Sequence, residues 1–265
     1  MGTAEAPPRT SADDRKTGCY VYGIVPADVE IAADATGIGD PPARIELVKE
    51  GQIAALVSEI DLGYPIGRPE DLMAHEELLD AATRAVPVLP IRFGAVLGDS
   101  GSVAADLLAP RHDEFAALLA DLEGRAQFVV HGRYLEDALF GEVVSENPDI
   151  AKLREQTRGR SEGETRPLLI QLGELIGAAI DEKRAADTSR AAELLRPHCV
   201  ALVVRPTSHE HDAFRIAALV ETAERSQWDE IIESIAQEWY SRMTVRLLGP
   251  LAPYDFVSSE PTSAA

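Results

Sequence analysis

The stretch Val88–Leu97, which reads VLPIRFGAVL, decides the predicted fold of the first half of the chain. A short apolar run that is rich in β-branched and aromatic residues and bounded by turn residues predicts a buried strand. Pro90 indicates that the strand begins after it or runs along a sheet edge. Arg92 interrupts the run, and a buried guanidinium is costly without a partner. The strand therefore carries an internal ion pair or directs a charge toward something outside.

The composition limits the class of protein. The chain has 265 residues, of which 45% are hydrophobic, enough for one large domain or two of ordinary size. Its formal net charge is -20, and a polyanion repels nucleic acid and anionic lipid. No apolar run approaches the length that spans a bilayer. Cys19 and Cys199 belong to no CxxC motif, which favours two free thiols in a cytosolic protein.

Sequence patterns predict an α+β fold with two domains between polar ends. Residues 1–17 lack the apolar core of a secretory signal and are predicted to be a disordered tail. An N-terminal α+β domain is predicted at 18–125, a ferredoxin-like α+β domain at 126–248, and a C-terminal tail at 249–265. We expect each domain to be an antiparallel sheet with helices on one face, ferredoxin-like in the order of its elements.

In the first half, a helix is predicted to begin at Pro69, with His75 on its apolar stripe. Ser102 is predicted to cap a further helix, which Pro110 breaks. Gly124 is predicted to end the helix that follows. Strands are predicted from β-branched and aromatic runs at 19–25, 44–49, 53–60 and 88–97.

In the second half, Ser226 begins a capping-box-like pattern before a helix at 228–239. An amphipathic helix is predicted at 168–179, and a separate helix is predicted to begin at the caps Asp187 and Thr188. Shorter helices are predicted at 135–144 and from Asn147. Strands are predicted at 126–134, 199–204, 213–221 and 243–248.

Arg92 and His75 are the first candidate functional residues. Arg92 either presents its charge to a partner protein or forms an ion pair with Glu76 or Glu77 on the neighbouring helix. His75 lies on an apolar stripe, where a lone histidine is typically a hydrogen-bonded structural group rather than a catalyst.

Sequence motifs for catalysis and metal binding are absent. The chain has no phosphate-binding loop, dinucleotide fingerprint, nucleophile elbow or zinc-protease helix. The run His209–Asp212, HEHD, resembles a metal site, but no third ligand with suitable spacing is evident, so we expect a polar turn and no metal. We also expect no cofactor.

The closing stretch Leu248–Val257, LGPLAPYDFV, is rich in proline and aromatic residues and cannot continue as a helix or a central strand. Its apolar side chains must pack somewhere. They either lie back across their own chain or form an exposed apolar segment that docks a partner.

Four stretches together resemble the gas vesicle protein F/L family, and they span about Tyr20 to Val257. They are YVYGIV at 20–25, His75-Glu76 on the predicted helix, LPIRFG at 89–94 and LGPLAPYDFV at 248–257. In the last stretch, Ala252 and Asp255 stand where the family commonly has a proline and a small hydroxyl residue.

The resemblance implies a non-enzymatic accessory protein in the cytoplasm, associated with gas vesicles. Such a protein binds the hydrophobic major shell protein and other accessory proteins, and takes part in nucleation or assembly of the vesicle wall, as a chaperone or a minor wall component. The acidic charge would keep such a complex dispersed while an apolar groove covers the client. We assign partner binding to Arg92, Phe93, Leu251, Tyr254 and Phe256, and structural roles to His75, Gly94, Gly249 and Pro250.

A second hypothesis stays open at this point. Ferredoxin-like folds host many unrelated functions. The chain could therefore be a small-molecule or anion-binding module, or an enzyme, that uses Arg92 and His75 at a cleft between the domains.

Overall fold

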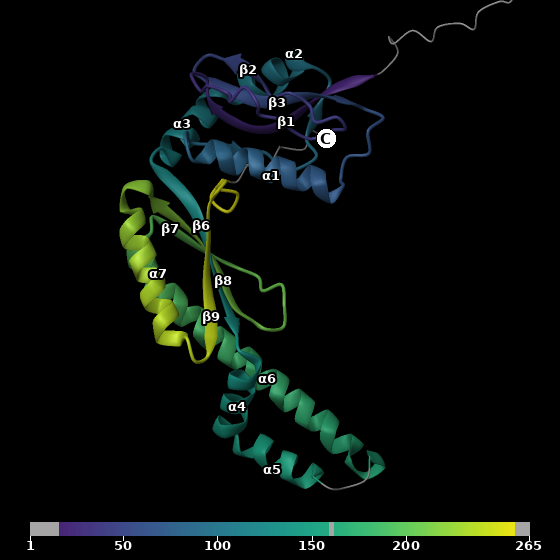
Figure 1. Cartoon of the computed structure of the whole chain (residues 1–265), viewed down its shortest axis with the longest axis vertical. Helices are drawn as coiled ribbons and strands as arrows, with labels where there is room; N and C mark the ends of the chain where they lie inside the picture. The colour runs from purple at the N-terminus through teal and green to yellow at the C-terminus, as the bar shows by residue number, and fades with distance from the viewer. Residues whose placement is uncertain (1–15, 159–161, 258–265) are drawn as a thin grey trace, which may run out of the picture. The chain divides into compact units, whose positions relative to one another are not determined.

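The structure, a computed structural model, describes residues 16–158 and 162–257 (Figure 1). It divides into two compact units, the first reaching Glu123 and including Val257, the second running from Gly124 to Phe256. Most of the predicted tail at 1–17 lies outside the described residues, but Thr17 already begins the first strand. The mixed α+β class with two antiparallel sheets is confirmed.

The first unit is built on an antiparallel sheet in the order β2-β3-β1-β4, with β5 also paired to β1. The central strand β1 is apolar and aromatic, and its side chains from Tyr20 to Tyr22 are fully buried. The helices α1 and α3 pack against β1. The strands are β1 Thr17–Pro26, β2 Glu46–Glu50, β3 Ile53–Asp61, β4 Leu89–Pro90 and β5 Val96–Leu97. The longer helices are α1 Pro69–Thr83 and α3 His112–Leu122.

The prediction of one strand at 88–97 is wrong. Two strands of two residues each, β4 and β5, flank a turn at 91–95, and both pair with β1. Gly94 has a φ of 92°, a conformation that L side chains rarely adopt, so the backbone turns there rather than staying extended. The apolar pattern indicated burial correctly at Leu89, but it could not detect a left-handed glycine inside the run.

The helix predicted after Ser102 begins earlier and is less regular. Asp99 is the N-cap of α2 Ser100–Ser102, and its Oδ1 accepts a hydrogen bond of 2.7 Å from the Ser102 amide. The chain continues through a π-helical stretch, Val103–Leu108, and a 3-10 turn, Ala109–Arg111, directly into α3. Pro110 does not break this run because it occupies the first turn of the 3-10 segment, where no amide donor is needed.

The second unit contains an antiparallel sheet in the order β7-β8-β6-β9. Its central strands β6 and β8 are buried along most of their length. The ferredoxin-like character of this unit stays a prediction. The strands are β6 Arg125–Tyr134, β7 Ala201–Arg205, β8 Asp212–Glu221 and β9 Met243–Leu251. The helices are α4 Glu136–Glu146, α5 Pro148–Thr157, α6 Glu162–Leu195 and α7 Arg225–Trp239.

Three predicted boundaries in this unit are wrong. The two helices predicted at 168–179 and from Asp187 are one helix, α6, because Asp187 is not a cap: its Oδ2 accepts a hydrogen bond of 2.6 Å from Tyr134 Oη. The helix α7 begins at Arg225 and not after a cap at Ser226. The guanidinium of Arg225 pairs with Asp229 one turn later. The strand β9 continues to Leu251, three residues beyond its predicted end, because a bulge at Gly249 and Pro250 keeps it paired with β6.

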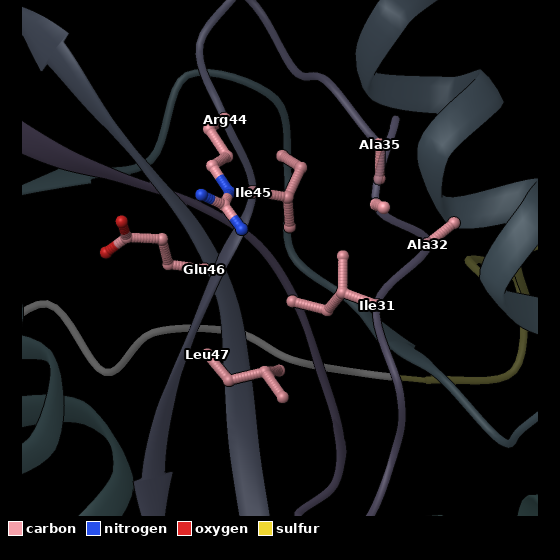
Figure 2. A pocket seen from close by; sticks show the side chains of 8 residues that line it. Ile31, Ala32, Ala35, Arg44, Ile45, Glu46 and Leu47 are labelled. Carbon is pink, nitrogen blue, oxygen red and sulfur yellow. The ribbon is translucent and has the colours of Figure 1, made fainter.

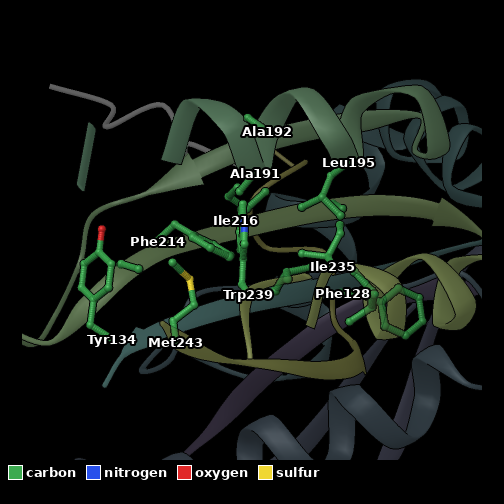
Figure 3. Packing of buried hydrophobic residues seen from close by; sticks show 14 of the residues in the cluster. Phe128, Tyr134, Ala191, Ala192, Leu195, Phe214, Ile216, Ile235, Trp239 and Met243 are labelled. Atoms are coloured by element: carbon green, nitrogen blue, oxygen red, sulfur yellow. The ribbon is translucent and has the colours of Figure 1, made fainter. Parts of the chain in front are cut away.

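The helices α6 and α7 cover one face of this sheet. Figure 3 shows Phe214 and Ile216 of β8 packed with Ala191 and Leu195 of α6 and with Trp239 of α7. The rings of Phe214 and Trp239 meet edge to face, with centroids 5.6 Å apart. In the part of the chain that the structure describes, no helix is long and apolar enough to cross a membrane.

Candidate functional site

Residues Ile91–Ala95, here called the Arg92 turn, project from β1 and are fixed by backbone hydrogen bonds on both sides. The Ile91 amide donates to the Tyr22 carbonyl, and the Val21 amide donates to the Ala95 carbonyl, each over 2.9 Å. Gly94 donates its amide to Tyr20 Oη over 3.0 Å. A turn held at its beginning, middle and end in this way presents a fixed shape to the surface.

An aromatic cluster of Tyr20, Tyr22, His75 and Phe93 lies beneath the Arg92 turn. Tyr20 Oη lies 3.0 Å from His75 Nδ1, and Tyr22 Oη lies 2.8 Å from Ser58 Oγ. The His75 ring stacks on Tyr22, with centroids 5.5 Å apart, and meets Phe93 edge to face at 5.5 Å. The sequence-predicted residues His75, Phe93 and Gly94 are therefore brought together.

The aromatic cluster is uncharged at neutral pH. Burial lowers the pKa of His75 to about 4, although a hydrogen bond with the backbone of Ile91 acts in the opposite direction. Burial also raises the pKa of Tyr20 well above its ordinary value, against the effect of the hydrogen bond from Gly94. His75 is fully buried, so it supports the turn and does not contact solutes. The structural role that the sequence assigns to His75 stays a prediction.

Arg92 is exposed at the tip of the turn. The alternative of an ion pair with Glu76 or Glu77 is wrong, since Arg92 forms no ion pair within residues 16–158 and 162–257. The turn carries its side chain outward instead of along a buried strand. Helix α1, whose His75 contacts Phe93, also carries exposed apolar side chains, because Leu72 and Met73 are 43% and 58% exposed.

The residues predicted at the end of the chain form a second candidate site, which belongs to the second unit. The peptide bond between Gly249 and Pro250 is cis, and Gly249 has a φ of 133°. A Cβ on Gly249 would lie 2.6 Å from the Phe128 ring, so only glycine fits there. Leu251 ends β9 opposite Gln127 and is half-buried, as is Phe256.

The residues that follow Leu251 lie across their own sheet. The Asp255 amide donates to Gln127 Oε1 over 3.1 Å, and Arg205 Nε lies 3.2 Å from Asp255 Oδ1. Ala252 and Pro253 are buried. Tyr254 is 36% exposed and is the predicted partner-binding residue here that remains most accessible.

A hollow in the first unit offers no catalytic arrangement. Its volume is about 370 Å³ and its lining is mostly aliphatic, with Arg44 and Glu46 as the ionisable side chains. Figure 2 shows Glu46 pointing to the other side of the strand from Ile31. Neither Arg92 nor His75 lines it. The lining residues are Ile31, Ala32, Ala33, Ala35, Arg44, Ile45, Glu46 and Leu47.

The run His209–Asp212 forms a polar turn that Asp212 closes. Its carboxylate accepts hydrogen bonds from the backbone amides of Ser208 and His209 and lies 2.8 Å from His131 Nε2. Burial disfavours the charged form, but these hydrogen bonds outweigh it and lower the pKa of Asp212 to about 2. Among the described residues, no group of three potential ligands could hold a metal ion.

The family model described as "Gas vesicle synthesis protein GvpL/GvpF" matches residues 18–258. The chain belongs to this family. A relative named gas vesicle protein F, from Streptomyces sp. (strain CB03234), is 33% identical over 243 residues, which cover 90% of this chain and 98% of the relative.

Two crystal structures of GvpF proteins share the fold of this GvpL/GvpF family member. The structure from Anabaena sp. PCC7120 is 24% identical, with a TM-score of 0.74, and the match covers 91% of this chain and 98% of the other. The structure from Microcystis aeruginosa is 21% identical, with a TM-score of 0.70 and coverage of 90% and 98%. These two likenesses show the fold, and the family model together with the Streptomyces relative makes the chain a gas vesicle protein.

Two of the residues that support the Arg92 turn of this family member, Tyr20 and Tyr22, were not predicted as site residues from the sequence. Tyr20 and Tyr22 alternate with apolar residues in a buried strand and so point to one face. A buried tyrosine hydroxyl needs a hydrogen-bond partner, and that requirement was the available signal. Gln127, buried in β6 and bonded to Asp255, carried the same kind of signal.

Proposed function

We propose that this GvpL/GvpF protein binds the hydrophobic major shell protein of the gas vesicle and takes part in nucleation or assembly of the wall. The observation that carries the proposal is the Arg92 turn, whose exposed guanidinium is held on a buried, hydrogen-bonded scaffold. Family membership supports the gas vesicle context. Other accessory proteins of the vesicle are further partners in this proposal.

The Arg92 turn suits partner binding because it is already formed. A preorganised loop loses little conformational entropy on association, so more of the contact energy appears as affinity. Arginine is enriched at the centres of protein interfaces, where its planar fork donates several hydrogen bonds. The exposed Leu72 and Met73 of α1 would supply apolar contact for a hydrophobic client.

The charge of the chain fits a chaperone role within the same proposal. A net charge of -20 would keep a complex with an apolar subunit dispersed through mutual repulsion. We expect light scattering from aggregating shell protein to fall when the chain is added at equal concentration. Unchanged scattering would contradict the chaperone role but not binding itself.

A non-catalytic role fits the geometry better than the small-molecule alternative. That alternative needs Arg92 and His75 to converge on one ligand, but His75 is fully buried and Arg92 is exposed. The protein would therefore act through its surface and without a cofactor, at the gas vesicle.

The direct test is a pull-down of purified shell protein with Arg92→Gln. We expect at least a tenfold weaker association, which corresponds to about 1.4 kcal/mol and is ordinary for an interface arginine. Arg84→Gln is the matched control, since Arg84 is also exposed in the first unit. Equal capture by both variants would remove the Arg92 turn from the proposal, and no capture by the unchanged chain would refute shell binding.

The closing residues are tested separately through Tyr254→Ala, which truncates a side chain that is 36% exposed. Reduced capture of shell protein at unchanged thermal stability would assign Tyr254 to the interface. Unchanged capture of shell protein would limit Tyr254 to a role within its own unit.

A further inference from the structure

A row of four basic side chains crosses the second sheet from edge to edge. Strand pairing places Arg205 of β7 opposite Arg215 of β8, Arg215 opposite His131 of β6, and His131 opposite Arg246 of β9. Directly paired residues of an antiparallel sheet point to the same face, with Cβ atoms about 5 Å apart. The four side chains therefore form one line on one face.

The basic row lies on the face that α6 and α7 leave open. Its sequence neighbours Val130 and Ile216 belong to the hydrophobic core beneath these helices, and Leu247 packs against that core. Successive residues of a strand point to opposite faces. The basic side chains must therefore point away from α6 and α7, and Arg133, two residues after His131, points with them.

Most of this positive charge is not neutralised. Arg205 pairs with Asp255 over 3.2 Å, and His131 Nε2 lies 2.8 Å from Asp212. The other two members, Arg215 and Arg246, form no ion pair with any residue in the described ranges. Neither does the adjacent Arg133, whose partner on β8 is Asp212. Arg133 and Arg246 are exposed, and Arg215 is half-buried. Like charges placed side by side on a sheet destabilise it, so the cluster has a cost in the isolated chain.

An apolar row runs beside the basic one. Val203 of β7 lies opposite Ala217, Ala217 opposite Val129, and Val129 opposite Leu248 of β9. The two ends of this row are accessible, since Leu248 is 51% and Val203 is 37% exposed. Between these ends, Ala217 and Val129 are buried. This face thus presents arginines without an ion pair, with accessible aliphatic side chains at its two edge strands.

We propose that this surface, the arginine face (Arg133, Arg215, Arg246, Val203 and Leu248), binds an acidic amphipathic segment of a partner protein. Carboxylates complement the arginine forks, and the apolar row fits the apolar side of such a segment. Arg215 and Arg246 stand two strands apart, roughly 10 Å, which matches residues two turns apart on a helix.

A protein segment fits better than a nucleic acid. A phosphate backbone carries no apolar group that could contact Val203 and Leu248. Its extended negative charge would also be repelled by the remaining surface of a chain with 45 acidic and 25 basic residues. A short acidic segment contacts only the arginine face. The inference concerns a different surface from the Arg92 turn and does not depend on binding of the shell protein.

The test uses the full chain and a fluorescent synthetic peptide with glutamate and leucine at amphipathic helical spacing. Fluorescence anisotropy at low ionic strength gives its affinity for the triple variant Arg133→Gln, Arg215→Gln, Arg246→Gln. We expect binding at least tenfold weaker than for the unchanged chain. The control variant Arg158→Gln, Arg190→Gln, Arg196→Gln removes the same charge from exposed positions outside the sheet and should bind as the unchanged chain does.

Three outcomes would overturn the proposal. Equal affinity of the two triple variants would show that net charge alone governs binding. Tighter binding of an oligonucleotide than of the peptide would assign the face to nucleic acid. Salt-sensitive self-association in sedimentation, lost only in the variant of the arginine face, would assign it to a second copy of the chain. Circular dichroism and urea unfolding of both variants check that folding is intact.

Discussion

The two units bury different chemistry beside their central strands. In the first unit, the buried aromatic residues Tyr20 and Tyr22 carry hydroxyls that bond to His75, Ser58 and the turn above them. In the second unit, most of the large buried side chains are apolar, and the exception among them is Tyr134, whose Oη donates to Asp187 Oδ2. The members of that core with the largest side chains are Phe128, Tyr134, Phe214, Trp228 and Trp239.

The buried groups of the first unit mainly fix the position of a surface turn, whereas those of the second unit mainly stabilise the fold. Buried hydrogen bonds contribute little net free energy, but they are costly to leave unmade, so they fix one geometry. An apolar core contributes more free energy for its area but does not direct a particular loop outward. The first unit accordingly holds the Arg92 turn in one shape. The second unit stabilises a sheet whose open face can carry charge.

The largest effect should come from the apolar core. Trp239→Ala removes a side chain that is 5% exposed and packs against Phe214. We expect the free energy of unfolding to fall by about 3–5 kcal/mol, because truncation leaves a cavity. Urea unfolding followed by circular dichroism measures the change. The adjacent Tyr240→Ala, at a position 76% exposed, should change it by less than about 0.5 kcal/mol; comparable losses in the two variants would contradict this account of the core.

The second effect is a pH dependence confined to the first unit. The folded pKa of His75 is about 4, below the ordinary value of about 6.5. Protonation therefore favours the unfolded state, so stability is complete above about pH 6.5 and is lost as pH falls toward 4, by roughly 3 kcal/mol.

Urea unfolding at pH 7 and pH 4, with hydrogen exchange read along β1, checks this pH dependence. His75→Phe keeps the ring but removes the titration, and should flatten the dependence in this window. If His75→Phe and the unchanged chain lose the same stability between the two pH values, His75 is not the titrating group.

The third effect separates the hydroxyl from the ring. Tyr20→Phe keeps the packing but leaves the Gly94 amide and His75 Nδ1 without their partner. We expect a loss of about 1–3 kcal/mol and faster hydrogen exchange at Gly94. Tyr240→Phe, which changes an exposed hydroxyl, is the control and should be neutral. Unchanged exchange at Gly94 would show that the hydroxyl does not hold the turn.

The smallest effect should come from the turn itself. Gly94→Ala meets no atom within 4 Å of the added Cβ, so its cost comes only from the φ of 92°. We expect about 1 kcal/mol of destabilisation, seen as a modest fall in Tm. Gly98→Ala, where φ is not in the left-handed region, should cost less. A larger fall for Gly98→Ala would mean that the left-handed backbone at Gly94 is not the constraint.

The sequence located the candidate stretch but not its shape. The run at 88–97 and the buried His75 were recognised from their patterns, because burial follows apolar periodicity. The turn within the run was not recognised, because the hydrogen bonds that bend it come from Tyr20 and Tyr22, about 70 residues earlier in the chain. The arginine face was also invisible, since its members come from four strands and meet only through their register.

By itself, the sequence determined the α+β class, most of the strands, the family and the acidic charge, because these depend on local pattern, motif order and composition. Only the tertiary structure decided that Arg92 stands exposed on a fixed turn and that Arg133, Arg215 and Arg246 share one open face. The physical reason is that strand register and buried hydrogen bonds join residues far apart in the chain, and no local pattern encodes which partners meet.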